Sequence, residues 1–491
     1  MSQVYLIGAG PGDEDLITVK AVKALKKCTA VMYDRLAGSG VLNYLNPDCK
    51  IYYCGKEPGC HYKTQDEINE MLVKLAKEGH IVGRIKGGDP YVFGRGGEEA
   101  LTLIDENISF EVIPGVTSAI SVLNYGGIPV THRGLSQGFH VLTGRSGKEL
   151  KHKWDVLAKC DETLIFLMGF ESLPMIVENL TTEGKSKDTP CAVVMRGTSS
   201  SQKKAVGTLE NIQKKVKEKG ISSPCIIVVG EVVTLNDKLN WFEKKPLFGA
   251  NICVTRGRGQ NSQIKDQLKD LGAEVREINA IKIKNNKEEL DKYKDKLENY
   301  DYILLTSTNS VNIFFDYLIE KSYDIRGINA KFGCIGSATA KALRKRGINP
   351  SYIAKEFVGE GLFEVIKNDL KENDKVLLPC SANARSFLKE SLEDKKCLVD
   401  RVHIYETVLG EGGDLRNFEI VQSVIYMSPS TVKNMIKLVG KENLTNKNNI
   451  AIGPITLKEL KAQGLDGVCA KEHSANGVIE EVKKVWGDRN A

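Results

Sequence analysis

The sequence predicts an α/β protein made of two successive parts. Short apolar runs rich in β-forming residues alternate with amphipathic helical stretches, beginning with VYLIG at 4–8 and LITVKAVKALKK at 16–27. This alternation is typical of layered α/β folds. Charged residues, proline and glycine interrupt it in NWFEKKPLFG at 240–249, after which a new strand, NICVTRG, begins. We therefore place a domain boundary between residues 245 and 246.

Eight apolar runs in the first part predict strands, each followed by a turn or a helix. They are VYLIG (4–8), AVMYD (30–34), IVGRI (81–85), FEVIPG (110–115), HVLTG (140–144), TLIFLMG (163–169), CAVVM (191–195) and CIIVVG (225–230).

The second part contains an internal repeat, which predicts two similar α/β lobes with a ligand-binding cleft between them. Three segments recur in the same order at nearly constant spacing. Two further segments precede the first copy, whereas the two segments that resemble them follow it. One lobe therefore uses both ends of this part, and the other is inserted within it. The recurring pairs are 304–315 with 425–436, 334–347 with 451–464, and 354–366 with 470–482.

Composition indicates a soluble globular protein. The 491 residues are 41% hydrophobic and 27% charged, the net charge is +6, and about three compact units are expected from the length. No apolar stretch reaches the roughly 20 residues of a membrane span, and the chain enters a strand without a signal peptide. We therefore expect a cytoplasmic protein that binds neither nucleic acid nor membrane. The twelve cysteines show no zinc-ligand spacing, so we expect reduced thiols and no metal.

The glycine-rich turn GAGPGD at 8–13 raises the question of a nucleotide. A dinucleotide fingerprint has glycine at its sixth place, but this turn has Asp13 there. A carboxylate at a helix N-terminus would repel a pyrophosphate, and the acidic Asp34 after the next strand does not remedy this. A tight turn with Asp13 capping a helix, a nucleoside site without a pyrophosphate, and a loop facing the substrate remain open.

Two further segments suggest close approach of a ligand to the backbone. The segment 83–99, GRIKGGDPYVFGRGGEE, has six glycines in 17 residues, and Asp89 is placed to accept hydrogen bonds from hydroxyl or amine groups. In PGVTSAI at 114–120, Thr117 and Ser118 fall in the first turn of a helix, where capping also explains them. Met168 ends a strand, and a core methionine also accounts for it.

The first part resembles uroporphyrinogen-III C-methyltransferases over residues 1 to about 243. The resemblance implies the two-lobed α/β tetrapyrrole-methylase fold, S-adenosylmethionine as methyl donor, and precorrin-2 as the product of two ring methylations. One departure is Glu57, where the family usually has arginine. The motifs are GAGPGD, YDRL, GKEPGCH, KGGDPYVFGRGGEE, PGVTSAI, GIPVTHRG, VMRGTSSSQ and SPCIIVVGEVV.

The second part contains, in this order, the motifs VTR, TSTNSV, IGSAT, VHIYETV, SPST and IGPIT. With these motifs it resembles uroporphyrinogen-III synthase over about 250–490, which implies that family's two-lobed α/β fold. We place lobe 1 at 246–283 and 411–491 and lobe 2 at 284–410. Since the synthase makes the methyltransferase's substrate, the whole chain resembles a fused two-enzyme protein of sirohaem and cobalamin synthesis.

The resemblance also implies site residues in the first part. Asp34 is the candidate base and Lys56 the candidate acid, although Asp34 could instead pair with Arg35 and Lys56 could bind a substrate carboxylate. Arg95 and Arg133 are expected to contact substrate carboxylates, although they could instead pair with a local acid such as Glu98 or Glu99. The positions that match the S-adenosylmethionine site are Pro11, Gly87, Gly88, Asp89, Val92, Thr117, Ser118, Met168 and Gly197.

In the second part, Tyr405 matches the family tyrosine placed to assist departure of the substrate hydroxyl. Packing at the hinge between the lobes is the alternative. Helix N-termini at repeated strand–helix junctions would offer N–H groups to substrate carboxylates, although capping alone would explain the residues there. These residues are Ser307, Thr339, Ser430 and Thr456.

Two other functions stay open at this stage. The first part could methylate a later precorrin, and the second part could bind a tetrapyrrole without cyclising it. Small tetrapyrroles are the expected partners in every case, and the resemblance suggests a homodimer formed through the methyltransferase part.

Overall fold

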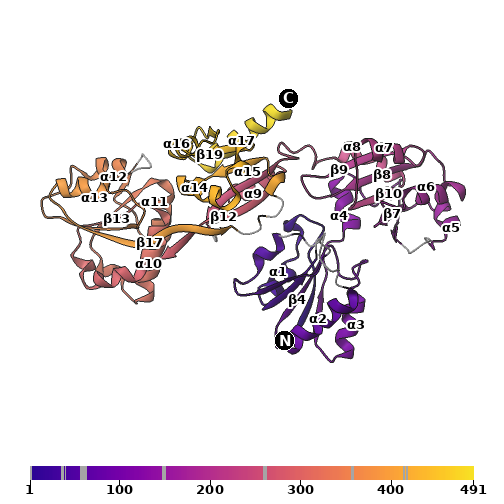
Figure 1. The fold of residues 1–491 in the computed structure, drawn as a ribbon, viewed down its shortest axis with the longest axis horizontal. Helices are drawn as coiled ribbons and strands as arrows, with labels where there is room; N and C mark the ends of the chain where they lie inside the picture. The colour runs from indigo at the N-terminus through magenta and orange to yellow at the C-terminus, as the bar shows by residue number, and fades with distance from the viewer. Residues whose placement is uncertain are drawn as a thin grey trace. The chain divides into compact units, whose positions relative to one another are not determined.

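The computed structural model describes residues 3–34, 38, 40–55, 64–145, 151–257, 263–354, 359–412, 415 and 418–490. The chain forms two compact units (Figure 1). The first comprises residues 1–252, 264–275 and 483–491, and the second comprises 253–263 and 276–482.

A parallel five-stranded sheet begins the first unit, in the order β3-β2-β4-β1-β5. Strand β1 is buried along its whole length, and its successive side chains enter two different apolar clusters, one on each face. This two-sided burial explains why the strand is a continuous apolar run. The strands are β1 (Val4–Gly8), β2 (Ala30–Tyr33), β3 (Lys50–Tyr53), β4 (Val82–Lys86) and β5 (Phe110–Ile113); the helices are α1 (Val19–Leu25), α2 (Gln65–Lys77), α3 (Gly96–Asp105) and α4 (Ser118–Tyr125).

A mixed five-stranded sheet follows, in the order β6-β7-β10-β8-β9. Strands β6 and β7 are parallel, whereas the other neighbours are antiparallel. The strands are β6 (Phe139–Thr143), β7 (Thr163–Leu167), β8 (Pro190–Met195), β9 (Lys203–Thr208) and β10 (Cys225–Val229); the helices are α5 (Trp154–Lys159), α6 (Leu173–Thr182), α7 (Ile212–Glu218) and α8 (Asn236–Leu239).

A single ten-stranded sheet organises the second unit, in the order β15-β14-β13-β16-β17-β12-β11-β18-β19-β20. The long strands β12 and β17 pair antiparallel at its centre, and the order of strands on either side mirrors the sequence repeat (Figure 1). The strands are β11 (Asn251–Gly257), β12 (Glu274–Asn285), β13 (Tyr302–Leu305), β14 (Lys331–Ile335), β15 (Tyr352–Ala354), β16 (Lys375–Ser381), β17 (Leu398–Gly412), β18 (Ser423–Tyr426), β19 (Asn448–Ala451) and β20 (Val468–Cys469).

The repeat is confirmed by the helices, since each copy supplies three strand–helix units. Helices α10, α11 and α12 follow β13, β14 and β15, just as α14, α16 and α17 follow β18, β19 and β20. The helices from α9 on are α9 (Gln263–Asp270), α10 (Thr308–Glu320), α11 (Gly336–Lys345), α12 (Gly359–Ile366), α13 (Phe387–Asp394), α14 (Pro429–Val439), α15 (Glu442–Thr445), α16 (Pro454–Ala462) and α17 (Ala475–Asn490).

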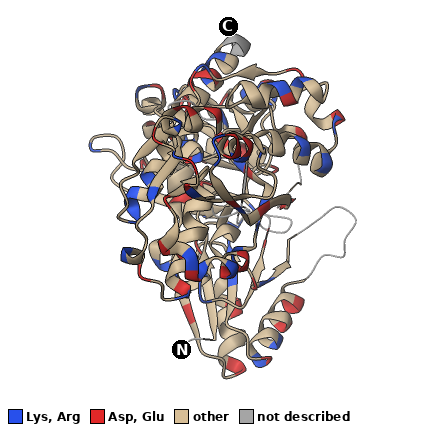
Figure 2. Cartoon of the chain, turned by 90° about the vertical axis from the view of Figure 1, so that its left-hand side faces the viewer, with Lys and Arg blue, Asp and Glu red and all other residues tan. Residues whose placement is uncertain are grey.

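The α/β fold class is confirmed, and all eight expected strands of the first part are present. The predicted boundary at 245/246 falls between α8 and β11. Among the described residues, no helix has both the length and the apolar character to cross a membrane. Basic and acidic residues are interspersed along the helices, in keeping with the small net charge (Figure 2).

Candidate functional site

Three backbone segments meet at the carboxyl ends of the parallel strands β1, β4 and β5. Gly10 and Gly88 form a bridge in which Gly88 N donates to Gly10 O over 2.6 Å and Gly10 N donates to Gly88 O over 3.2 Å. An added Cβ at Gly8 would overlap the backbone nitrogen of Gly115, and one at Gly115 would overlap the carbonyl oxygen of Gly88. Glycine at Gly8 and Gly115 is therefore required by the close approach of these backbone segments to one another, and we call this meeting of the loops after β1, β4 and β5 the glycine cradle.

The carboxylate of Asp89 links two of these loops through hydrogen bonds. One carboxylate oxygen accepts from Tyr91 N at 2.8 Å, and the other accepts from Gly115 N at 3.0 Å. Each oxygen keeps a second lone pair, so the carboxylate can also accept from a ligand hydroxyl or amine. The structure thus gives Asp89 a positioning role that the sequence did not reveal, beside its expected contact.

Helix α4 begins next to this cradle. Its N-cap, Thr117, accepts from Ala119 N at 3.4 Å, and Ser118 is the first helical residue. A Cβ placed on Gly88 would lie 3.8 Å from Ser118 N and 3.9 Å from Thr117 Cα. These two residues therefore adjoin the Gly87–Gly88 turn, and Thr117 also has the alternative capping role.

The GAGPGD turn contacts the loop after β8. Asp13 N donates to Thr198 Oγ1 at 3.1 Å, and a Cβ on Gly12 would lie 3.0 Å from the same oxygen. Gly197 is buried against Val122 in the middle of α4, so this loop lies beside both that helix and the GAGPGD turn. Asp13 caps the 3₁₀ turn Glu14–Leu16 by accepting from Asp15 N, which is the capping role given as one of three alternatives for this turn.

Met168 and Val92 are the apolar members of the predicted site. Met168 follows β7, is 49% exposed and has a left-handed backbone with φ of 56°. It therefore is not a core methionine. Val92 is also exposed, in the loop after Asp89. Both side chains are available to a ligand.

An ionic network that the sequence analysis missed lies beneath Asp34. Arg84 of β4 is 2% exposed; its Nη2 donates to Asp34 Oδ2 at 2.9 Å, and its Nε donates to Glu99 Oε1 at 3.0 Å. Lys86 Nζ donates to the same Glu99 oxygen at 2.8 Å. Two cations thus balance two carboxylates, mostly away from solvent.

The network fixes the charge state of Arg84. Burial lowers the pKa of Arg84, but Asp34 and Glu99 outweigh this and leave the pKa raised. Burial also lowers the pKa of Lys86, as does the charge of Arg84. Glu99 Oε2 is buried and has no hydrogen-bond partner in the described part of the chain. The signal in the sequence was a pair of basic residues, two apart, within the apolar strand VGRIK.

Asp34 is therefore paired with Arg84 of a neighbouring strand. The carboxylate is partly exposed at the end of β2, where it can contact a ligand while Arg84 holds its orientation. Arg35 and Lys56, and the departure at Glu57, lie outside the described residues.

The two arginines expected to bind substrate carboxylates are both exposed. Arg95 caps α3 in a left-handed conformation and donates through Nε and Nη2 to Glu98, at 2.8 and 2.6 Å. This is the local pairing that was the alternative for Arg95. Arg133 lies in the turn bounded by the His132–Ser136 bridge.

In the second unit, Tyr405 lies in β17 and is 6% exposed within an apolar cluster. Its hydroxyl is 2.9 Å from Ser307 Oγ, and burial raises its pKa. Ser307 is the N-cap of α10 and accepts from Ser310 N at 3.0 Å. The structure thus brings together Tyr405 and Ser307, residues 98 apart in the sequence.

The other three predicted residues stand at helix beginnings. Thr339 of α11 and Thr456 of α16 are buried, whereas Ser430 in the first turn of α14 is exposed. The N-cap of α14 is Ser428, which forms a capping box with Thr431.

A polar pocket of 520 Å³ lies beside β17 and is lined in part by Arg401, whose Nε is buried without a hydrogen-bond partner among the described residues. Ala382, in its wall, donates its N–H to Tyr405 O at 2.8 Å, so the pocket adjoins the backbone of Tyr405. The lining is mixed in charge, because Glu288 and Glu289 lie in it beside Arg401. The lining residues are Asn286, Glu288, Glu289, Tyr293, Ala382, Arg401, Val402 and His403.

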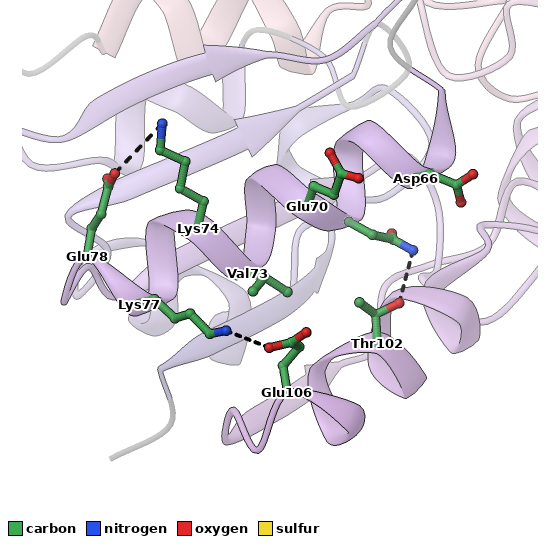
Figure 3. Close-up of a pocket in the computed structure, with 9 residues that line it drawn as sticks. Asp66, Glu70, Val73, Lys74, Lys77, Glu78, Thr102 and Glu106 are labelled. Atoms are coloured by element: carbon green, nitrogen blue, oxygen red, sulfur yellow. Dashed lines mark hydrogen bonds and ion pairs between the residues drawn. The ribbon is translucent and has the colours of Figure 1, made fainter.

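A second pocket, of 630 Å³, lies between α2 and α3 and contains no predicted site residue (Figure 3). Its wall includes the ion pair of Lys77 with Glu106 at 2.5 Å and the hydrogen bond from Asn69 to Thr102 at 3.0 Å. Ion pairs across an exposed groove are typical of a solvated surface.

Comparisons with known proteins identify both parts. The family model of tetrapyrrole (corrin/porphyrin) methylases matches residues 3–213, and that of uroporphyrinogen-III synthase HemD matches residues 262–480. A uroporphyrinogen-III C-methyltransferase from Priestia megaterium is 49% identical over 239 residues, which cover 48% of this chain and 100% of that protein. The crystal structure of the uroporphyrin-III C-methyltransferase from Thermus thermophilus complexed with S-adenyl homocysteine is 37% identical, with a TM-score of 0.41, over 47% of this chain and 98% of that chain.

One relative spans the whole length. A porphyrin biosynthesis protein HemD from Ruminiclostridium josui is 38% identical over 495 residues, which cover 99% of this chain and 98% of that protein. Both parts of the chain are thus enzymes, a C-methyltransferase and a synthase. The chain belongs to the family of porphyrin biosynthesis proteins in which a tetrapyrrole methylase is joined to a uroporphyrinogen-III synthase.

Proposed function

We propose that the second part cyclises hydroxymethylbilane to uroporphyrinogen III and that the first part methylates this product twice, with S-adenosylmethionine, to give precorrin-2. The single observation that carries the proposal is the order of the two family matches along one chain, 3–213 and 262–480. Since the synthase product is the methyltransferase substrate, joining the two enzymes serves consecutive reactions.

The glycine cradle supports S-adenosylmethionine as the methyl donor. A Cβ at Gly8 or Gly115 would collide with neighbouring backbone, so glycine keeps the three loops together at the carboxyl ends of the parallel strands, which is the edge where sheets of this kind bind ligands. Asp89 offers lone pairs to hydroxyl or amine groups, and Met168 and Val92 offer exposed apolar contacts. The bound donor supplies an electrophilic methyl group on a cationic sulfur, so positioning accounts for most of the acceleration.

Asp34 is the proposed proton acceptor when a ring carbon of the substrate attacks the methyl group. The pyrrole N–H loses its proton as the new bond forms, and Asp34 is a partly exposed carboxylate at the end of β2, the neighbour of β4. Arg84 holds this carboxylate in one orientation through two N–H groups, at 2.9 and 3.4 Å. Arg84 thereby acts as a positioning residue for the base.

Tyr405 is the proposed acid of the synthase. Its hydroxyl can donate to the departing hydroxyl of the bilane if the hydrogen bond with Ser307 opens. The intermediates that follow are intrinsically reactive, so the cleft mainly has to hold the chain in the conformation that closes with inversion of the last ring.

The proposal is tested with the pure chain and with two fragments, 1–245 and 246–491. The full chain, given hydroxymethylbilane and S-adenosylmethionine, should form precorrin-2 by way of uroporphyrinogen III, as identified by mass spectrometry. Each fragment should fold and keep one activity, because each is expected to have its own core. The proposal would be contradicted if the chain methylated only a later precorrin and not uroporphyrinogen III. It would also be contradicted if the second fragment bound hydroxymethylbilane without cyclising it. Two insoluble fragments would contradict the boundary.

The donor site gives a sharper prediction. Asp89→Asn should weaken S-adenosylmethionine binding about 10- to 100-fold, because a charge-assisted acceptor of roughly 1.5–3 kcal/mol is lost. Calorimetry measures the affinity, and circular dichroism checks that the variant is folded. Glu106→Gln, at the groove between α2 and α3, should leave the affinity unchanged. An unchanged affinity in folded Asp89→Asn would remove Asp89 from the donor site.

A further inference from the structure

A cluster of three potential metal ligands lies in the second sheet of the first unit, and the proposed reaction does not use it. Nε2 of His140 is 2.7 Å from Oε2 of Glu162 and 3.4 Å from Sγ of Cys160. The Cys160 sulfur is 3.8 Å from the same Glu162 oxygen. All three residues are half-buried.

The strand register explains why these residues meet. β6 and β7 are parallel neighbours in which His140 pairs with Leu164. Side chains alternate along a strand, so Glu162, two residues before Leu164, faces the same side of the sheet as His140. Cys160 ends α5 in an extended conformation, with φ of −77° and ψ of 126°, which continues the same alternation.

The spacing of the three atoms fits a tetrahedral zinc ion. Ligand atoms bound to one such ion, with Zn–S near 2.3 Å and Zn–N or Zn–O near 2.0 Å, lie about 3.3–3.6 Å from one another. The sulfur–nitrogen and sulfur–oxygen distances in the cluster, 3.4 and 3.8 Å, are close to this range. Only the distance between His140 Nε2 and Glu162 Oε2, at 2.7 Å, is too short, and it would have to increase by roughly half an ångström for both atoms to bind one ion.

The ligand types point to the same ion. Thiolate and imidazole select zinc over magnesium or calcium, and a carboxylate oxygen is also a zinc ligand, so the three residues would leave one position of a tetrahedral ion for water. One thiolate and one carboxylate neutralise the charge of a divalent ion. Beside the cluster, Lys185 Nζ donates to the carbonyl oxygens of Cys160 at 2.7 Å and Ala158 at 3.3 Å. Its hydrogen bonds are to backbone, so they leave the three ligand atoms free for a metal.

We propose that His140, Cys160 and Glu162 form a zinc site separate from the methyl-transfer chemistry. Binding replaces the proton of the Cys160 thiol with the metal and releases that proton to solvent. The ion connects β6, which lies at the edge of its sheet, to the turn between α5 and β7. The spacing of the cysteines led to the expectation of no metal. Cysteine spacing could not reveal this site, because the site has one cysteine: Cys160 and Glu162 come from one short segment, and His140 comes from a neighbouring strand.

The test uses the full chain after removal of metal with a chelator. Titration with Co²⁺ should give one tight equivalent and a near-ultraviolet thiolate-to-cobalt absorption band, which Zn²⁺ should abolish by displacement. Cys160→Ser should lose the band, and His140→Gln and Glu162→Gln should weaken binding about tenfold or more while keeping some of the band. The thermal midpoint should rise with Zn²⁺ in the wild type and much less in the variants.

Cys469→Ser is the matched control, because Cys469 is the other half-buried thiol among the described cysteines. It should behave as the wild type does. A wild-type chain without the band would overturn the proposal, as would a band of equal strength in Cys160→Ser. If Cys160→Ser does not fold, unchanged Co²⁺ affinity in folded His140→Gln and Glu162→Gln would overturn it instead.

Discussion

Arg84→Met should lower the free energy of unfolding of the first unit by about 3–5 kcal/mol, because it breaks a buried ionic network by removing one member. Arg84 is 2% exposed and bridges Asp34 to Glu99, and Glu99 is fully buried. Methionine has a similar volume, so the loss is mainly electrostatic. Methylation should also slow, since Asp34 loses the group that orients it.

Urea denaturation of the full chain, followed by circular dichroism, measures this effect, and the transition of the second unit serves as an internal reference. Lys77→Met is the matched control, because it removes a cation from an exposed pair with Glu106 at 2.5 Å. It should cost no more than about 1 kcal/mol. Equal effects of the two substitutions would show that the buried network contributes no more than a surface ion pair.

Tyr405→Phe should slow cyclisation of hydroxymethylbilane by about 10²–10⁴-fold, the usual contribution of one acid–base group. The phenyl ring keeps its place in the apolar cluster, so the free energy of unfolding should change only by the roughly 0.5–1.5 kcal/mol of one hydrogen bond, here with Ser307 at 2.9 Å. Free bilane closes spontaneously without inversion. The ratio of type I to type III uroporphyrinogen should therefore rise, which chromatography measures.

Tyr300→Phe is the control for this prediction. Tyr300 is also buried in the second unit, and its hydroxyl donates to Asp400 at 2.6 Å. It should give type III product at the wild-type rate, and both variants should methylate added uroporphyrinogen III normally. If Tyr405→Phe also forms type III product at the wild-type rate, Tyr405 is a packing residue and cleft geometry accounts for the rate.

The central strands could be predicted from the sequence because they are buried on both faces and are therefore apolar throughout. β1, β7 and β10 are examples, since every residue in them is buried. β3 and β9 were missed for the converse reason. Each lies at the edge of its sheet and mixes lysine with apolar residues, so neither gives a continuous apolar signal.

The site could be predicted only in part. Glycine-rich loops are local features, so the cradle around Gly88 was found from the sequence. The partner of Asp34 was not, because Arg84 is 50 residues away and reaches Asp34 through the pairing of β2 with β4, in which Met32 lies opposite Arg84. The sequence shows that Arg35 is next to Asp34 along the chain. The order of the strands in the sheet is what brings Arg84 close to Asp34 in space.

The ten-stranded sheet also sets the order in which a growing chain can fold. β11 has β18 as its neighbour, yet the ribosome makes more than one hundred and fifty residues between them, which takes roughly ten to thirty seconds. The inserted strands β13–β16 can pair during that time, while one edge of β11 stays open. On one polysome, the open edge of β11 in one growing chain could pair with β18–β20 of another chain, which would give a domain-swapped dimer. Such swapping is therefore a risk during synthesis, because in the finished enzyme β18 already covers that edge.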